Sequence, residues 1–163
     1  MQYVVFNLTT GEPIKWGTCQ EEMLAAQAGP GEKALATSAL SVEGNKPAIW
    51  EEVKAIRAQK IDGGCATPWG IAETDELSRS NISGAALAAV IAKSANSPFE
   101  ITWTFADNST QDLNADEMIN LGLIAMQHVN ACHVNARRLR ALIEGATDMA
   151  ELLAIDVSSG WPA

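Results

Sequence analysis

The longest regular pattern of apolar and polar residues in the chain runs from Asn114 to about Gly145. Apolar and small residues recur there at spacings of three and four, which is typical of one face of a helix. Asp116 and Glu117 fall in the first turn, where negative charge complements the helix dipole, and Gly145 supplies a stop. The pattern therefore predicts one long amphipathic helix. The seam along one side of it consists of Met118, Leu121, Ala125, His128, Cys132, Asn135, Leu139 and Leu142.

A second seam of small residues lies beside the first on the same predicted helix. It consists of Gly122, Ala125, Val129, Cys132, Ala136, Leu139 and Ile143. Because two adjacent seams can pack on two neighbours, we predict one neighbour within the chain and another in a symmetry copy. The polar residues His128, Cys132 and Asn135 are expected to set the register of that packing at some cost in stability. The residues of the first seam are therefore interface candidates, as is Trp161, because an undocked C-terminal tail would fray.

The N-terminal residues show strand patterns instead. Alternating side chains over residues 3–8 and 14–18 predict a hairpin, followed by a short helix over 21–28 and a third strand over 33–42. A unit of this size buries little surface alone and needs a partner surface. We therefore predict a small α+β attachment unit over residues 1–42.

A second predicted domain covers residues 49–163, after a turn or linker at Glu43-Gly44-Asn45-Lys46-Pro47. Thr74 and Thr147 are the predicted caps of two of its helices. Before and after the long helix, its predicted elements are a helix over 49–60, a loop or short strand over 65–73, a helix over 75–93, a hairpin with strands over 99–105 and 109–113, and a short helix over 147–154. The whole chain is thus expected to have an α+β fold, with a small N-terminal β-hairpin and helix unit and a mainly helical domain that contains one hairpin.

Composition and charge limit the classes of molecule that the chain is expected to bind. The chain has 163 residues, of which 47% are hydrophobic, so it can bury a real core. Its net charge of −9 argues against binding to nucleic acid or to an anionic membrane. No apolar run approaches the roughly 20 residues that span a bilayer, and no signal peptide is expected. The three cysteines, Cys19, Cys65 and Cys132, are far apart and are expected to be reduced thiols.

Few residues of the chain are candidates for catalysis or metal binding. His128, Cys132 and His133 form the only grouping that resembles a metal site, and its remaining ligands would have to come from distant segments. We interpret them instead as polar members of the helical seam. No nucleophile elbow or phosphate loop is present. We therefore predict no catalytic residue, no metal and no cofactor, and keep a small metal-dependent enzyme that uses His128 and Cys132 as the weaker alternative.

The order of several segments resembles a known family. The first of them are Glu52-Val53-Lys54-Ala55-Ile56-Arg57 before Gly63-Gly64, Thr74-Asp75-Glu76-Leu77-Ser78-Arg79, and Ile82-Ser83-Gly84-Ala85. The others are Ile101-Thr102-Trp103, Ala106-Asp107, Leu113-Asn114-Ala115-Asp116-Glu117-Met118, His128, Leu139-Arg140-Ala141-Leu142-Ile143 and Gly160-Trp161-Pro162. From Trp50 to Pro162 the chain resembles a domain of unknown function that recurs in bacteriophage tail-fibre and related tail-tip proteins.

This resemblance implies a structural component of the virion tail, made in the bacterial host cytoplasm, and not an enzyme. It implies a homo-oligomer, with a trimer as the expected form, and contacts with other phage tail or baseplate proteins. Since the chain is short for a fibre, we expect a compact tail-fibre or baseplate subunit, or an adaptor, with residues 1–42 as the attachment module. The alternative is a tail-fibre assembly chaperone, which would be absent from mature particles.

Overall fold

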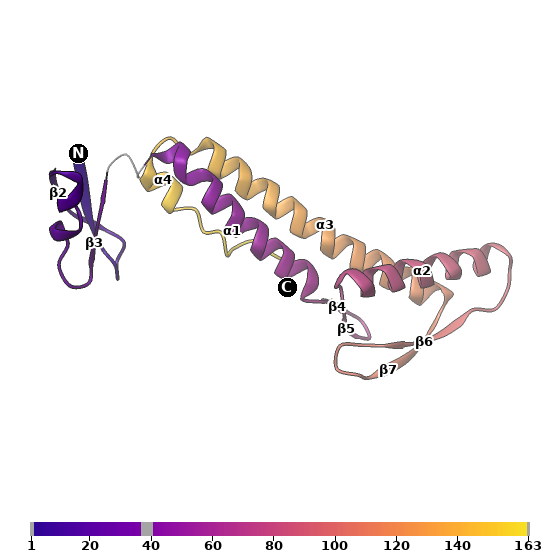
Figure 1. Ribbon diagram of the computed structural model, residues 1–163. Helices are drawn as coiled ribbons and strands as arrows, with labels where there is room; N and C mark the ends of the chain where they lie inside the picture. The colour runs from indigo at the N-terminus through magenta and orange to yellow at the C-terminus, as the bar shows by residue number, and fades with distance from the viewer. Residues whose placement is uncertain (1, 37–40, 163) are drawn as a thin grey trace. The chain divides into compact units, whose positions relative to one another are not determined.

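The computed structural model describes residues 2–36 and 41–162 (Figure 1). Helices and small antiparallel sheets make up the chain, which confirms the predicted α+β fold. In order, the elements are β1 (Gln2–Asn7), β2 (Pro13–Thr18), η1 (Glu21–Met23), η2 (Ala25–Gln27), β3 (Glu32–Ala36), α1 (Val42–Asp62), β4 (Cys65–Thr67), β5 (Gly70–Ala72), α2 (Glu76–Ser94), β6 (Glu100–Thr104), β7 (Thr110–Asn114), α3 (Ala115–Gly145) and α4 (Met149–Leu153). None of the described helices is both long and apolar enough to cross a membrane.

The chain divides into two compact units. Unit 1 comprises Met1–Glu51 with Ala141–Asp156, and unit 2 comprises Glu52–Arg140 with Val157–Ala163. The predicted domains over 1–42 and 49–163 stay predictions.

The turn predicted at Glu43–Pro47 is wrong, because these residues form the first turns of α1. Ser41 starts the helix: its hydroxyl accepts a hydrogen bond from Gly44 N at 3.3 Å, and its carbonyl accepts one from Asn45 N at 3.1 Å. Lys46 and Glu43 also form an ion pair at 2.5 Å. Pro47 lies near the start of the helix, where it removes one backbone hydrogen bond.

Unit 1 contains a three-stranded antiparallel sheet in the order β2-β1-β3. Tyr3, Val4 and Val5 of the central strand are buried. The predicted third strand over 33–42 is observed only to Ala36. Its remainder lies partly outside the described residues, and Val42 begins α1. In place of the short helix predicted over 21–28, the chain forms the two single turns η1 and η2.

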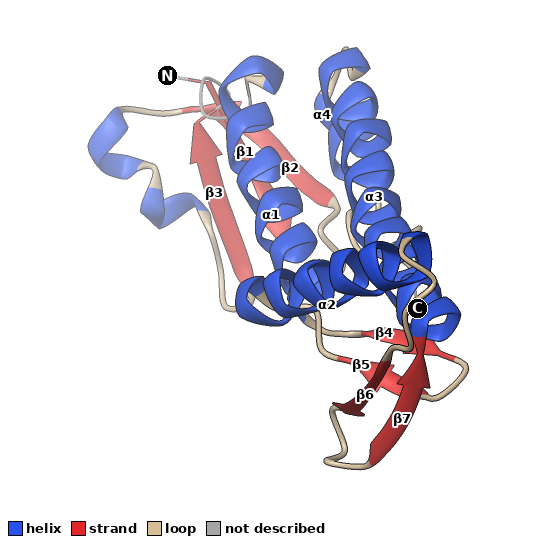
Figure 2. Cartoon of the chain, turned by 90° about the vertical axis from the view of Figure 1, so that its right-hand side faces the viewer, coloured by secondary structure: helices blue, strands red, loops and turns tan. Residues whose placement is uncertain are grey.

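Unit 2 has a core between α2, the first half of α3 and two hairpins, β4-β5 and β6-β7 (Figure 2). The residue that leads β7 into α3, Asn114, caps that helix. Asn114 Oδ1 accepts hydrogen bonds from Asp116 N at 3.0 Å and Glu117 N at 3.1 Å, and Glu117 Oε2 accepts one from Asn114 N at 2.9 Å. The buried core residues are Cys65, Ala72, Ile82, Ala89, Phe105, Leu113, Met118, Leu121 and Ala125.

The two threonines predicted as helix caps have other roles. Asp75 caps α2, because its carboxylate accepts hydrogen bonds from Leu77 N and Ser78 N. Thr74 is buried: its hydroxyl donates to Ile61 O at 2.6 Å and accepts from Gly64 N at 3.0 Å. Thr74 therefore ties the end of α1 to the start of α2.

At α4, the carboxylate of Asp148 accepts a hydrogen bond from Glu151 N at 2.8 Å. The predicted cap, Thr147, contacts the Glu151 carboxylate through its backbone N and its hydroxyl. An acidic side chain was thus the better acceptor in both helices, since it carries the charge that the helix dipole favours.

Candidate functional site on the long helix

The predicted interface seam lies mostly inside the chain. Met118, Leu121, Cys132 and Leu139 are 0% exposed, so these side chains pack within the chain. Their contact with a symmetry copy stays a prediction. Of the other seam residues, Ala125, His128 and Asn135 are also buried, and Leu142 is exposed.

One of the two candidate metal ligands of the seam, His128, connects α3 to the end of α1 within unit 2. His128 Nε2 lies 2.9 Å from Lys60 O. Because a carbonyl only accepts, Nε2 carries the proton in this tautomer. Cys132 Sγ lies 4.0 Å from the same nitrogen. Burial raises the pKa of the Cys132 thiol, an effect that the nearby charge of Lys60 opposes. The described part of the chain holds no group of three or more His, Cys, Asp or Glu side chains placed to bind a metal.

Asn135 holds the C-terminal tail of unit 2 against α3. Its Nδ2 donates to Ser159 O at 2.9 Å, and its Oδ1 accepts from Arg138 Nε at 2.9 Å. Gly160 has a φ of +79°, and a Cβ atom there would lie 2.6 Å from Asn135 Oδ1. Trp161 is half-buried and donates from Nε1 to Val157 O at 2.9 Å. The tail therefore docks within its own unit, and a role of Trp161 between copies stays a prediction.

The side of α3 opposite the buried seam is apolar and exposed. We call Leu123, Met126, Gln127, Asn130 and Val134 the outward face. Leu123 is 48% exposed, Met126 56% and Val134 49%. No Asp, Glu, Lys or Arg occurs between Met118 and Ala136. An exposed helix face ordinarily carries charges, so this surface is unusual for contact with water alone.

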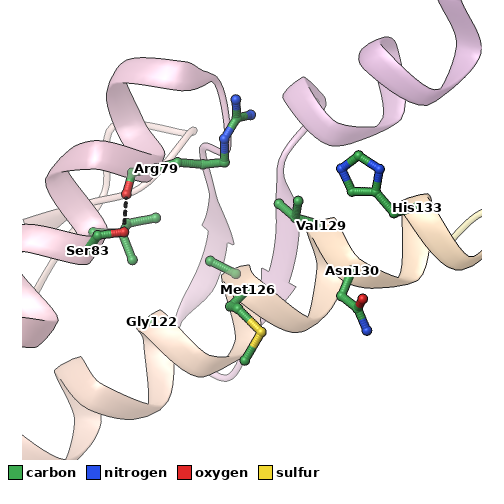
Figure 3. A pocket seen from close by; sticks show the side chains of 9 residues that line it. Arg79, Ser83, Gly122, Met126, Val129, Asn130 and His133 are labelled. Carbon is green, nitrogen blue, oxygen red and sulfur yellow. Dashed lines mark hydrogen bonds between the residues drawn. The ribbon is translucent and has the colours of Figure 1, made fainter. Parts of the chain in front are cut away.

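Two grooves flank the outward face. The groove between α2 and α3 has a volume of about 430 Å³ (Figure 3). It is lined by Arg79, Ile82, Ser83, Gly122, Ala125, Met126, Val129, Asn130 and His133. The groove between α3 and the tail has a volume of about 500 Å³. It is lined by Gln127, Asn130, Ala131, Val134, Asn135, Arg138 and Gly160. Asn130 lines both grooves, so the outward face forms the ridge between them.

Two polar side chains at the α2–α3 groove, Ser83 and Arg79, form hydrogen bonds within the chain. The Ser83 hydroxyl donates to Arg79 O at 2.8 Å, as Figure 3 shows. Arg79 Nη1 contacts Asp62 Oδ1 at 2.9 Å and also donates to Thr74 O. Gly122 lets the two helices approach, because a Cβ atom there would lie 2.9 Å from the Ala86 Cβ. The lining of the groove is thus largely apolar, and its arginine is already paired with Asp62.

The exposed side of α2, like the outward face of α3, is uncharged and carries exposed apolar side chains. No charged residue occurs from Ser80 to Ala92, and Leu87, Val90 and Ile91 are exposed. Spacings of three and four identified the buried seam, but they did not identify these outward residues. The sequence signal that would have identified them is the absence of charge over more turns than one buried face requires.

The comparisons with known proteins place most of the chain in one family. The family described as Domain of unknown function (DUF4376) matches residues 45–158, which is well over half of the chain. No curated protein and no solved structure matches the chain significantly.

Proposed function

The chain belongs to the DUF4376 family, a domain of unknown function, and we propose that this member is a structural protein of a bacteriophage virion. In this proposal it is a tail-fibre or baseplate subunit, or an adaptor, that acts through self-assembly and protein contacts. The phage context comes from the resemblance of residues 50–162 to tail-fibre and tail-tip domains. The chain's other expected partners are tail and baseplate proteins.

The observation that carries a role in protein contacts is the uncharged, exposed surface of α2 and α3. Leu87 and Ile91 on α2 and Met126 on α3 are each more than half exposed. Leaving large apolar side chains in water gains nothing for a free chain, whereas burying them against another protein stabilises the complex by about 25 cal/mol per Å². Exposed apolar surface of this kind is typical of interaction sites.

The buried side of α3 supplies the rigidity that such a surface needs. Apolar side chains, the His128 contact and the Asn135 bond to the tail all hold this helix to the rest of unit 2. A fixed helix loses little conformational entropy on association, so a partner can bind it at low cost.

Mass spectrometry of purified virions, from a host that encodes the chain, tests the proposal. We expect the intact chain in particles that survive density-gradient purification, at a fixed ratio to the other tail proteins. Its presence in infected or induced cells, together with its absence from the particles, would instead identify an assembly chaperone and contradict the virion role.

A further inference from the structure

The outward face of α3 has a charge at each end and none between. Asp116, Leu123, Asn130 and Arg137 lie seven residues apart in the sequence. Seven residues make almost two turns of an α-helix, so such residues form one line that drifts by about 20° at each step. The line therefore begins with a carboxylate, continues through the outward face and ends with a guanidinium group.

We propose that two copies of the chain pack the outward faces of α3 against each other in antiparallel orientation. This inference rests on the proposed function, in which the chain acts by association with itself. The two-fold axis passes between Met126 and Gln127, the midpoint of the line. Asp116 of each copy then lies opposite Arg137 of the other copy. Asp116 is well exposed and contacts Lys93 through Oδ1, so a second cation can share its carboxylate.

The shape of the surface is complementary to itself. The outward face is a ridge with a groove on either side, and Met126 stands where the ridge meets the α2–α3 groove. Rows of side chains on one helix pack between the rows of the other, and a two-fold axis makes both halves of such a contact identical. Because the chain carries a net charge of −9, two copies repel over most of their surface. The uncharged outward face is where they approach at the lowest electrostatic cost.

The charges select the antiparallel orientation. In a parallel pair, Arg137 and Arg138 of one copy would meet the same residues of the other copy, and the acidic first turns would also meet. Such like-charge contacts oppose association. A three-fold axis along this face would bring three copies of the arginine pair together. The trimer that the resemblance implies would therefore need a different contact surface.

Light-scattering mass of the purified full chain tests the contact. The chain has a mass of 17.3 kDa, and we expect the wild type to have twice that mass. Val134→Glu places a charge within the apolar part of the contact, so we expect a monomer, with a rise of at least 100-fold in the dissociation constant. Leu77→Glu is the matched control, because Leu77 is 70% exposed at the start of α2 and lines neither groove beside the outward face. This variant should stay dimeric.

A charge exchange tests the orientation. Arg137→Asp places an acidic group opposite Asp116 of the second copy, and we expect the dissociation constant to rise at least tenfold. Adding Asp116→Arg to the same chain restores an opposite pair in the antiparallel dimer, so the double variant should recover most of the affinity. Circular dichroism of each variant checks that the helices are intact.

A wild-type monomer or trimer would overturn the inference, as would a Val134→Glu dimer of unchanged affinity. Failure of the double variant to recover affinity would overturn the antiparallel orientation. These results are independent of the virion experiment, because a monomeric chain can still be present in purified particles and a dimeric one can be absent from them.

Discussion

The two sides of α3 carry similar apolar residues, but one side is buried within the chain and the other is exposed. The inner side combines leucine and methionine with polar groups whose partners lie in the same chain, such as His128 with Lys60 O and Asn135 with Ser159 O. The outward side has large apolar groups at Leu123, Met126 and Val134, and they remain about half exposed. The inner side therefore accounts for the fold, and we propose that the outward side contacts another molecule.

The largest difference between the two sides should appear on truncation of a leucine. Leu121 is fully buried, so Leu121→Ala leaves a cavity and should lower the free energy of unfolding by about 2–5 kcal/mol. Leu123→Ala should change it by only about 0.5 kcal/mol. Urea unfolding in the Val134→Glu background, where the outward face is unpaired, measures both. Equal losses would contradict the division of α3 into a core side and a contact side.

Two hydroxyl groups, one buried and one exposed, extend the comparison between buried and exposed positions. Thr74→Val leaves the buried Ile61 O and Gly64 N without their side-chain partner, so we expect a loss of about 1–3 kcal/mol. Ser83→Ala removes an exposed hydroxyl from the groove and should cost about 0.5 kcal/mol or less. Thr74→Ser keeps the hydroxyl and should recover most of the loss. Thermal unfolding of the three variants would refute the bridging role of Thr74 if Val and Ser behaved alike.

Two glycines give a comparison of opposite sign. Gly160→Ala forces an alanine to adopt a positive φ and places its Cβ against Asn135, so we expect a loss of about 1–2 kcal/mol. Gly84 lies in α2 with open space around it, and Gly84→Ala should gain about 0.5–1 kcal/mol from the better helix former. Hydrogen exchange of the tail should quicken in Gly160→Ala alone. Unchanged exchange there would mean that Asn135 does not hold the tail.

The smallest effect concerns charge at a helix start. Hydrogen bonds from the Ser78 hydroxyl and from the Ser78 and Leu77 backbone lower the pKa of Asp75. A group whose pKa is lower in the folded state stabilises the fold above its unfolded pKa, and this contribution is lost as the pH falls through the folded pKa. Asp75→Asn keeps an acceptor at the cap but removes the charge. The free energy of unfolding of the Asp75→Asn variant should therefore be lower than that of wild type near neutral pH and equal to it in strong acid. A difference that did not change with pH would contradict this account.

Sequence patterns predicted the elements whose signals are local. The long helix begins one residue after its predicted start at Asn114, and the β6-β7 hairpin follows the alternation around Trp103. The start of α1 was missed because glycine, asparagine and proline at positions 44–47 are typical of turns, whereas the deciding contact is a hydrogen bond to Ser41. The role of Thr74 could not be predicted from the sequence either, because its partners Ile61 and Gly64 come close only when the two helices pack.

The candidate surface was predicted only in part. Periodicity identified the residues of α3 that matter for packing, and the assignment of their polar members to contacts between copies stays a prediction. Within the chain, Asn135 bonds to a tail segment more than 20 residues away, a pairing that no local pattern contains. The residues of the outward face recur with the same helical period as those of the buried seam and differ from them in exposure. This difference is seen only in the folded chain, where other elements cover one side of α3 and leave the other side exposed.

The distance between spin labels in two copies tests the antiparallel contact most directly. Cys19→Ser removes the one cysteine that is not buried, after which labels are attached at Gln127→Cys or, in a separate sample, at Asp116→Cys. We expect a short distance for the pair at 127 and a separation of about 30 Å for the pair at 116, given a rise of 1.5 Å per residue. Short distances at both positions would show a parallel contact, and the absence of a defined distance at 127 would show that the outward faces do not meet.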